Sequence, residues 1–506
     1  MNRLVKAVFT LTAFSVIDRA LGFVFKIYLS REMGAAALGV YQIALSFFFV
    51  LSTLTTSGLP LIVGKKTAGL LAEGKTRDTG AVVGAGLLIN CVLSLLLAGV
   101  VFALSPVLPA VLSGEEAATL LLLLLPALIA GGTGAAFRGN LWGREKFFAV
   151  SLIELLEQVF RIAICVVLFA VGMGKTTAAV ISLVIAMFIS AALTAAAFFT
   201  SGGRVRSARG QLRPLIAESA PISALRASSS LTSVLMAVIV PFLFSVSGYD
   251  HEQSLAMFGA GIGMAMPLLF LPITVIGSLS YALIPELSRA AAVGKMNEVR
   301  ERTETAIKFS VIVSAACIPV FGGVGNAVGL FLYGDAVAGE AIQLGAYLLV
   351  PIALENITSS MMNSLNMEKQ GFVNYVIGTA VTVGVMFCFY GHFSVRAVCV
   401  AMFVGLTLST ALDVICIRKH TGLSLSFLRT LLGACMLSVP CTMLATLTLR
   451  LLSPLPSIIG IVLGAAAGCL SVLALMWTFG LFGGFMLRPG RKKEKGASRK
   501  HLPTGG

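Results

Sequence analysis

The residues of this chain with the clearest potential for chemistry are charged side chains inside long apolar runs. The run at 7–29 carries polar or small residues at intervals of four, three and four positions, and these are Ser15, Arg19, Gly22 and Lys26. Such intervals place them on one face of a helix, with Asp18 beside Arg19. A central Arg or Asp in a membrane costs about 2.5–3.5 kcal/mol on insertion scales, so these groups are expected to face a partner or a wet cavity.

Two further runs carry the same kind of polar stripe. In the run at 148–171 the stripe consists of Glu154, Glu157, Gln158 and Arg161. In the run at 217–246 an arginine lies among serines, as Ser219, Ser223, Arg226, Ser230 and Ser233. Three stripes that each extend over two or more turns favour a shared aqueous cavity. The alternative is that they only join helices, and Glu157 and Arg161, four positions apart, would then neutralise each other.

The charges deep inside the apolar runs nearly cancel. The basic ones are Arg19, Lys26, Arg161 and Arg226, and the acidic ones are Asp18, Glu154, Glu157 and Glu355. We predict that the four basic residues bind substrate in the cavity and that the four acidic residues serve coupling or structure. The balance of signs does not say whether the cargo is anionic or cationic.

The sequence predicts no catalytic site and no bound metal or cofactor. All nine Cys fall inside apolar runs without a C-x-x-C pair, and the four His have no metal-ligand spacing. The longest hydrophilic segments, roughly 285–305 and 488–506, are too short for a catalytic domain. The chain is therefore expected not to be an enzyme. With no ATPase module in the sequence, any pumping is expected to use ion gradients, the membrane potential or the gradient of the substrate.

These residues sit on elements that only a membrane can solvate. Hydrophobic residues make up 57% of the 506 residues and charged residues only 12%. A run of about 20 apolar residues spans a bilayer as a helix, so the sequence predicts an all-α integral membrane fold with about fourteen transmembrane helices. Their predicted ranges are 7–29, 37–61, 80–104, 117–137, 148–171, 177–200, 217–246, 254–281, 306–332, 341–364, 371–391, 395–417, 430–452 and 457–486.

Basic residues determine the predicted orientation. If the N-terminus is cytoplasmic, 29 of the 37 Lys and Arg fall in cytoplasmic segments, and those that fall outside are Arg31, Lys175, Arg396 and Arg450. This positive-inside bias predicts an even number of spans with both termini in the cytoplasm. The net charge of +15 is assigned to loops beside anionic lipid headgroups rather than to nucleic-acid binding, and the tail at 488–506 to a basic cytoplasmic segment that faces lipid.

An internal repeat divides the predicted helices into two lobes. The spans at 37–61 and 254–281 each end near an aliphatic-Pro step followed by a basic loop, and each follows a span with an arginine-centred stripe. Because six is an even number, two six-helix lobes are expected to share one orientation, with the cargo site between them. The predicted divisions are an N-lobe at 1–215, a C-lobe at 216–425 and two extra helices at 426–487.

Several segments, in their order and spacing, carry a family resemblance. They are DRALGFVFKIYLSREMGAAALGVYQIALSFFFVLSTLTTSGLPLIVGKK at 18–66, FRGNLWGREKF at 137–147, IELLEQVFRI at 153–162, LIPELSR at 283–289 and NSLNMEKQGF at 363–372. Together they resemble the polysaccharide-transport branch of the multidrug/oligosaccharidyl-lipid/polysaccharide superfamily, and within it the stage V sporulation protein B group. The resemblance covers essentially the whole chain.

That resemblance implies a V-shaped bundle like those of MATE transporters and lipid II flippases, with a hydrated cavity that works by alternating access. It implies a lipid-linked oligosaccharide or cell-wall precursor as cargo, moved from the cytoplasmic to the outer leaflet of the bacterial plasma membrane, with sporulation as one setting. In related lipid II flippases, basic residues of the first helix engage the diphosphate. Arg19 has a matching position and Lys26 lies about one residue away from the second. The arginine of their second helix has no counterpart in 38–64, which is uncharged, and Arg226 is our own candidate for that charge.

Two other functions remain open on the sequence. A cation-coupled exporter of amphipathic drugs, from another branch of the same superfamily, would use Asp18 and the Glu154/Glu157 pair. A non-transporting membrane scaffold that recruits envelope-synthesis proteins would use the stripes only as structure. Under the scaffold hypothesis, Arg19→Ala would leave glycan export intact.

Overall fold

The computed structural model describes residues 3–208, 210–424, 426–454 and 456–481, and every regular element in those ranges is a helix. The first helix, α1 (Arg3–Thr56), holds two predicted spans in one run of 54 residues. At 1.5 Å per residue a straight helix of that length would measure roughly 80 Å, far more than the roughly 30 Å hydrocarbon core. The run is broken at Gly34, whose φ of 78° suits a residue without a Cβ. The two halves of α1 therefore cross the membrane separately.

The other helices follow in chain order. In the first half of the chain they are α2 (Leu59–Ala72), α3 (Thr79–Ala103), α4 (Leu108–Val111), α5 (Glu115–Gly143), α6 (Phe147–Ala170), α7 (Lys175–Thr200) and α8 (Leu212–Val246). In the second half they are α9 (His251–Phe258), the π-helix η1 (Gly259–Ala265), α10 (Met266–Ala292), α11 (Met296–Tyr333), α12 (Ala336–Gly345), the 3₁₀ turn η2 (Ala346–Leu348), α13 (Leu349–Ser364), α14 (Glu368–Cys388), α15 (Val395–Thr421), α16 (Phe427–Leu451) and α17 (Ser457–Thr478).

The protein is a multi-pass membrane protein. Within the described residues, eleven helical segments are long and apolar enough to span a bilayer, and one of them, Phe14–Ala72, is the segment that contains the break at Gly34. Helix α6 is continuous but carries a charged stripe that lowers its hydropathy, and the apolar part of α8 is confined to Ser230–Val246. When the break in α1, the charged stripe of α6 and the shorter apolar part of α8 are taken into account, each of the fourteen predicted spans overlaps one helix, half of α1, or a run of two or three consecutive helical elements.

Some predicted helix ends were wrong. Helix α11 begins at Met296, ten residues before the predicted 306, so most of the segment read as a hydrophilic loop is helical. Arg302 holds this extension together, because it pairs with Glu298 at 2.8 Å and with Glu286 at the end of α10. The last helix ends at Thr478, short of the predicted 486.

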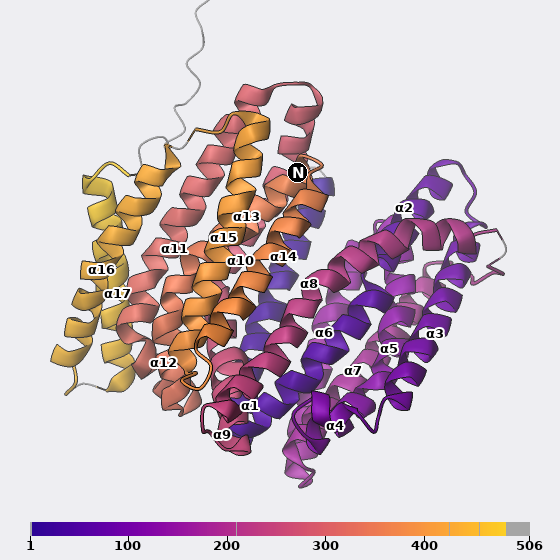
Figure 1. The fold of residues 1–506 in the computed structure, drawn as a ribbon. Helices are drawn as coiled ribbons and strands as arrows, with labels where there is room; N and C mark the ends of the chain where they lie inside the picture. The colour runs from indigo at the N-terminus through magenta and orange to yellow at the C-terminus, as the bar shows by residue number, and fades with distance from the viewer. Residues whose placement is uncertain (1–2, 209, 425, 455, 482–506) are drawn as a thin grey trace, which may run out of the picture.

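The helices form two groups that stand side by side (Figure 1). In one, α5 packs against α2, α3, α7 and α1; in the other, α11 packs against α12, α13, α16 and α17. Figure 1 shows α1 beginning at one edge of the bundle, here called the N-terminal side, whereas α4, α9 and α12 lie at the opposite side. The predicted lobe boundary at 215 falls in the first turn of α8 and stays a prediction.

Backbone contact joins the two groups at the opposite side. A Cβ placed on Gly39 would lie 2.2 Å from the Leu255 carbonyl oxygen, and one on Gly259 would lie 2.0 Å from that of Ala35. Both distances are far below a van der Waals contact, so only glycine fits at either position. The second half of α1 therefore crosses α9 and η1 without intervening side chains.

Two polar contacts lie beside this crossing. The Nε of Arg31 donates a hydrogen bond of 2.7 Å to the Leu332 carbonyl at the end of α11, where a helix carries partial negative charge. Lys175, at the start of α7, pairs with Glu32 at 3.2 Å. Together with the glycine crossing, these contacts close the opposite side of the bundle.

Candidate functional site

A cavity of about 900 Å³ lies between the two groups of helices, and α1, α8, η1, α10, α13, α14 and α15 line it. It reaches the N-terminal side at Asn363 and Glu368, which are exposed at the turn between α13 and α14. It extends inward to Gln42 on α1 and Met236 on α8. The cavity therefore faces the N-terminal side, while the crossing of α1 with η1 closes the other.

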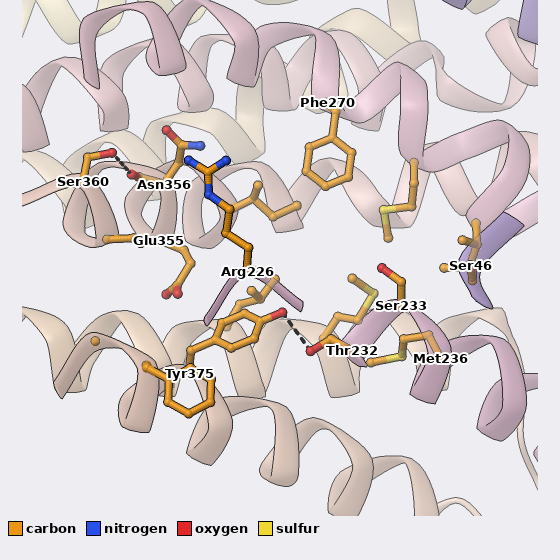
Figure 2. A pocket seen from close by; sticks show the side chains of 18 of the residues that line it. Ser46, Arg226, Thr232, Ser233, Met236, Phe270, Glu355, Asn356, Ser360 and Tyr375 are labelled. Carbon is orange, nitrogen blue, oxygen red and sulfur yellow. Dashed lines mark hydrogen bonds between the residues drawn. The ribbon is translucent and has the colours of Figure 1, made fainter. Parts of the chain in front are cut away.

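Arg226 projects into this cavity from α8 (Figure 2). Its side chain is exposed, and Nη1 lies 3.4 Å from the Ser57 carbonyl oxygen. Ser233, two turns further along, lines the same cavity. Since a guanidinium offers several donors in a fixed plane, Arg226 can bind an anionic group there.

Not all of the predicted serine stripe on α8 faces water. Ser219 and Ser223 are 7% and 8% exposed, and the Ser223 hydroxyl accepts a hydrogen bond of 3.1 Å from the Gly58 amide. A Cβ at Gly58 would lie 2.4 Å from the Ser219 carbonyl oxygen. The small side chains of this part of the stripe let two helices approach closely. The prediction of a water-exposed face was therefore wrong at Ser219 and Ser223.

A second cavity, of about 360 Å³, contains three of the predicted basic residues, Arg19, Lys26 and Arg161. It lies between α1, α6 and α10, and none of the described residues that line it is acidic. Lys26 also lines the larger cavity, so the two spaces meet at its side chain. The structure thus brings Arg19, Lys26 and Arg161 together, and places Arg226 across the larger space.

Arg161 is held by aromatic residues rather than by Glu157. Its Nη2 donates a hydrogen bond of 2.6 Å to the Tyr41 hydroxyl, and its Cζ lies 5.3 Å from the centre of the Phe25 ring. Its Nε is buried and makes no hydrogen bond among the described residues. Because the Arg161 guanidinium is partly removed from water and has an unused donor, an anion that binds beside it would be stabilised. No ion pair joins Arg161 to Glu157 in the described part of the chain, so the structure does not support the alternative in which these two residues neutralise each other.

The other predicted acids differ in their surroundings. Glu154 pairs with Arg138 of α5 at 2.8 Å, so Arg138, which directly follows the predicted span at 117–137, lies inside a helix. Asp18 is half-buried near Glu154 and Glu157. Glu355 lines the larger cavity and accepts a hydrogen bond of 3.3 Å from Thr410.

Sequence reasoning missed a buried acid close to Glu355. Asp413 of α15 is 1% exposed, and its carboxylate accepts hydrogen bonds from Asn374 at 2.8 Å and from Thr358 at 3.1 Å. The signal was available, because Asp413 is a charge inside the predicted span at 395–417. Within the described residues, no group of three or more His, Cys, Asp or Glu side chains is arranged to hold a metal ion.

The sequence analysis also missed the polar residues that line the cavity on α13 and α14. Besides Glu355 they include Asn356, Ser359, Ser360 and Asn363 of α13 and Glu368 and Tyr375 of α14. The positions on α13 are spaced by one or three residues and mark one face of that helix, and the two positions on α14 lie seven residues, or two turns, apart. That spacing could have revealed them, but neutral Ser and Asn are common in membrane helices and therefore give a weaker signal than a charged residue.

Comparison with known proteins matches residues 4–291 to a family model described as polysaccharide biosynthesis protein. Stage V sporulation protein B of Bacillus subtilis is 24% identical over 439 residues, covering 83% of this chain and 84% of that protein. Lipid II flippase MurJ of Bacillus subtilis is 20% identical over 473 residues, covering 84% of this chain and 85% of that protein.

Solved structures share the fold. A lipid II flippase MurJ structure, described as an inward closed conformation, matches with a TM-score of 0.74 at 13% identity and covers 93% of this chain and 98% of its own. An inward-facing MATE family multidrug resistance transporter of the MOP superfamily matches with a TM-score of 0.68 at 15% identity, covering 82% of this chain and 98% of its own. The fold expected from the sequence, a helical bundle like those of MATE transporters and lipid II flippases, is confirmed.

Proposed function

This chain belongs to the polysaccharide biosynthesis protein family, and from that premise we propose that it is a flippase. Its cargo would be a lipid-linked oligosaccharide or cell-wall precursor, carried from the cytoplasmic to the outer leaflet by alternating access. The resemblance to stage V sporulation protein B and to MurJ supports this class of cargo.

The observation that carries the proposal is a cavity of about 900 Å³ inside a membrane-spanning bundle, with Arg226 exposed in it. Its volume is at the upper end of the range of about 300–1,000 Å³ typical of ligand sites. An anionic sugar headgroup is heavily penalised in hydrocarbon, so a wet path across the membrane removes the main barrier to its movement. The lipid tail can stay in the bilayer.

We place the phosphates of the cargo at Lys26, where the two cavities meet. Arg19 and Arg161 lie on one side of this point and Arg226 on the other, so cationic donors surround it. Charge-assisted hydrogen bonds to phosphate are about twice as strong as neutral ones. Of the acids, Glu154 has a structural partner in Arg138, whereas Asp18, Glu157 and Glu355 are our candidates for coupling to a cation.

The proposed orientation puts the N-terminal side of the bundle in the cytoplasm. Basic residues gather at the helix ends on that side, whereas Arg31, Lys175, Arg396 and Arg450 lie at the other ends. The cavity would then face the leaflet where lipid-linked precursors are made. A fluorescent-protein fusion at the C-terminus should fluoresce, and a periplasm-active phosphatase inserted after Gly172 should be active; the reverse pattern contradicts this orientation.

The test is an assay of outer-leaflet lipid-linked glycan in bacterial cells that lack a redundant relative. Depletion of the protein should lower the outer-leaflet signal at least tenfold. Arg226→Ala should do the same, whereas Arg450→Ala, at an exposed helix end outside both cavities, should not. Both variants must accumulate to the wild-type level. An unchanged signal on depletion contradicts the flippase proposal, and an unaffected Arg226→Ala variant favours a non-transporting scaffold.

One observation favours a second function, the export of amphipathic drugs. The inner part of the cavity is lined by Met236, Met266, Met402 and Phe270, and flexible methionines suit varied apolar ligands. This function predicts ion-dependent extrusion of cationic dyes that Asp18→Asn abolishes. The exposed guanidinium of Arg226 and the basic second cavity argue for an anionic cargo instead.

A further inference from the structure

The residues of α13 fall into two sets, one that packs against neighbouring helices and one that lines the large cavity. Sixteen residues form this helix, and eleven of them are buried. The five that are not buried are all polar and all line the large cavity: Glu355, Asn356, Ser359, Ser360 and Asn363. The helix therefore presents one continuous polar face to the cavity and is otherwise enclosed in protein.

Several groups on this face are free to bind a ligand. The Ser359 hydroxyl and the Asn363 amide are exposed and make no hydrogen bond to the described residues. The Ser360 hydroxyl donates a bond of 2.9 Å to the Asn356 carbonyl of its own helix, which leaves its oxygen able to accept. An amide and a hydroxyl both donate and accept, and sugar hydroxyls do the same. The face therefore has the hydrogen-bonding capacity that a glycan requires.

Helix α14 adds aromatic surface to the same cavity. Phe372 and Tyr375 line it one turn apart, and both are partly buried. The Tyr375 hydroxyl donates a hydrogen bond of 2.8 Å to Thr232 on α8, which fixes its ring, as Figure 2 shows. The apolar C–H face of a sugar ring packs on an aromatic ring, so Phe372 offers a stacking surface beside the polar stripe.

The charge of this wall restricts the sugars that fit. Among the described residues, its carboxylates are Glu355 on α13 and Glu368 on α14, whereas the basic residues of the cavity, Lys26 and Arg226, come from α1 and α8. A sugar with a carboxylate would meet like charge on α13 and α14. A neutral sugar would not.

We propose that the cavity faces of α13 and α14 form a sugar-binding wall for neutral glycans, distinct from the cationic groups that hold the phosphates. This inference rests on the proposed flippase function and specifies its cargo. The anionic and neutral ends of one headgroup would then be bound by different helices: phosphate by α1 and α8, and sugars by α13 and α14.

The experiment uses the full-length protein in phospholipid vesicles and three probes. They are a polyprenyl diphosphate with two neutral sugars, the same lipid with a uronic acid in place of the second sugar, and the bare polyprenyl diphosphate. Transbilayer movement of each is measured for the wild type, for Arg226→Ala and for the double variant Ser359→Ala/Asn363→Ala. The double variant removes no hydrogen bond between described residues, so its folding should be normal. Thr448→Ala, at a partly exposed position of α16 outside both cavities, is the control.

The double variant should slow the neutral glycan at least fivefold and leave the bare diphosphate unchanged. Arg226→Ala should slow all three probes. The wild type should move the neutral glycan at least fivefold faster than the acidic one, and Glu368→Gln should narrow that gap. If the wild type moves the probes but the double variant slows all of them equally, or none, the sugar-binding wall is refuted while the flippase function stands. If the wild type moves none of them, both proposals fail.

Discussion

Arg161 of α6 donates a hydrogen bond of 2.6 Å to the hydroxyl of Tyr41, and the same guanidinium lies 5.3 Å from the ring centre of Phe25. Phe25 precedes the break at Gly34 and Tyr41 follows it, so one side chain contacts both halves of α1. Arg161 therefore fixes the angle between the two spans whose residues line both cavities.

Tyr41→Phe should weaken this clamp. The variant removes the hydroxyl and keeps the ring, so the expected loss of stability is about 1 kcal/mol, the usual net contribution of a hydrogen bond. Thermal unfolding of the purified protein in detergent measures it. Tyr28→Phe is the matched control, because the Tyr28 hydroxyl on the same helix has no hydrogen-bond partner among the described residues while its ring stacks on Phe169. Equal melting temperatures for the two variants would contradict the clamp.

Gly39→Ala should force the closed side of the bundle apart. The added methyl would lie 2.2 Å from the Leu255 carbonyl oxygen, which belongs to a helix backbone and cannot move alone. We expect a loss of stability of about 1–3 kcal/mol, as for other overpacked contacts, and greater labelling of residues at the opposite side by impermeant reagents. Gly99→Ala on α3, where no atom lies within 4 Å of the new methyl, should be neutral or slightly stabilising. A wild-type melting temperature for Gly39→Ala would show that the crossing is looser than described.

Asn374→Ala should destabilise the protein through Asp413. The amide donates a bond of 2.8 Å to that buried carboxylate, and its removal leaves an acceptor short of a partner, at a cost of about 1–3 kcal/mol. Asn363→Ala removes the same group at an exposed position where the side-chain amide makes no hydrogen bond to the described residues, and it should leave the melting temperature unchanged. The comparison isolates the buried hydrogen bond from the loss of an amide in general. Equal shifts for the two variants would contradict it.

We expect the ion pair of Arg138 and Glu154 to stabilise the fold and to take no part in coupling transport to a cation. Their side chains are 25% and 41% exposed, so the pair should stabilise the fold by at most about 1 kcal/mol. The double variant Arg138→Gln/Glu154→Gln should lose less stability than the sum of the single variants, and should keep its transport rate. A double-mutant cycle of melting temperatures, run beside the vesicle assay, measures both. Loss of transport in the double variant at normal stability would instead assign Glu154 to coupling.

The membrane fold could be predicted from the sequence because apolar runs of sufficient length have one stable solution in lipid. Gly34 shows the limit of that reasoning. The short segment between two predicted spans looked like a loop, yet a single glycine with positive φ joins the helices directly. The charged segment before 306 looked like a loop as well, but ion pairs of Arg302 with Glu286 and Glu298 keep it helical. Hydropathy indicates which segments are stable in lipid, but it does not indicate a helix junction at one glycine or a charged helix that ion pairs stabilise.

The candidate site was predictable in its charges but not in their partners. Arg19, Lys26 and Arg161 do share one cavity, as their positions on polar faces suggested. That Arg161 would bind Tyr41 rather than Glu157 depends on how α1 and α6 pack, which periodicity within one helix does not contain. Ser219 and Ser223 illustrate the same point, because a serine face suits a close helix contact as well as it suits water.

The nearly complete enclosure of α13 has a consequence for how such proteins diversify. Its buried positions cannot change without disturbing neighbours, but the five cavity positions are constrained only by what occupies the cavity. Descendants of this chain could therefore exchange one glycan for another through a few substitutions there while keeping the same scaffold. Differences among relatives at positions 355, 356, 359, 360 and 363 should track the chemistry of their cargo more closely than does overall sequence divergence.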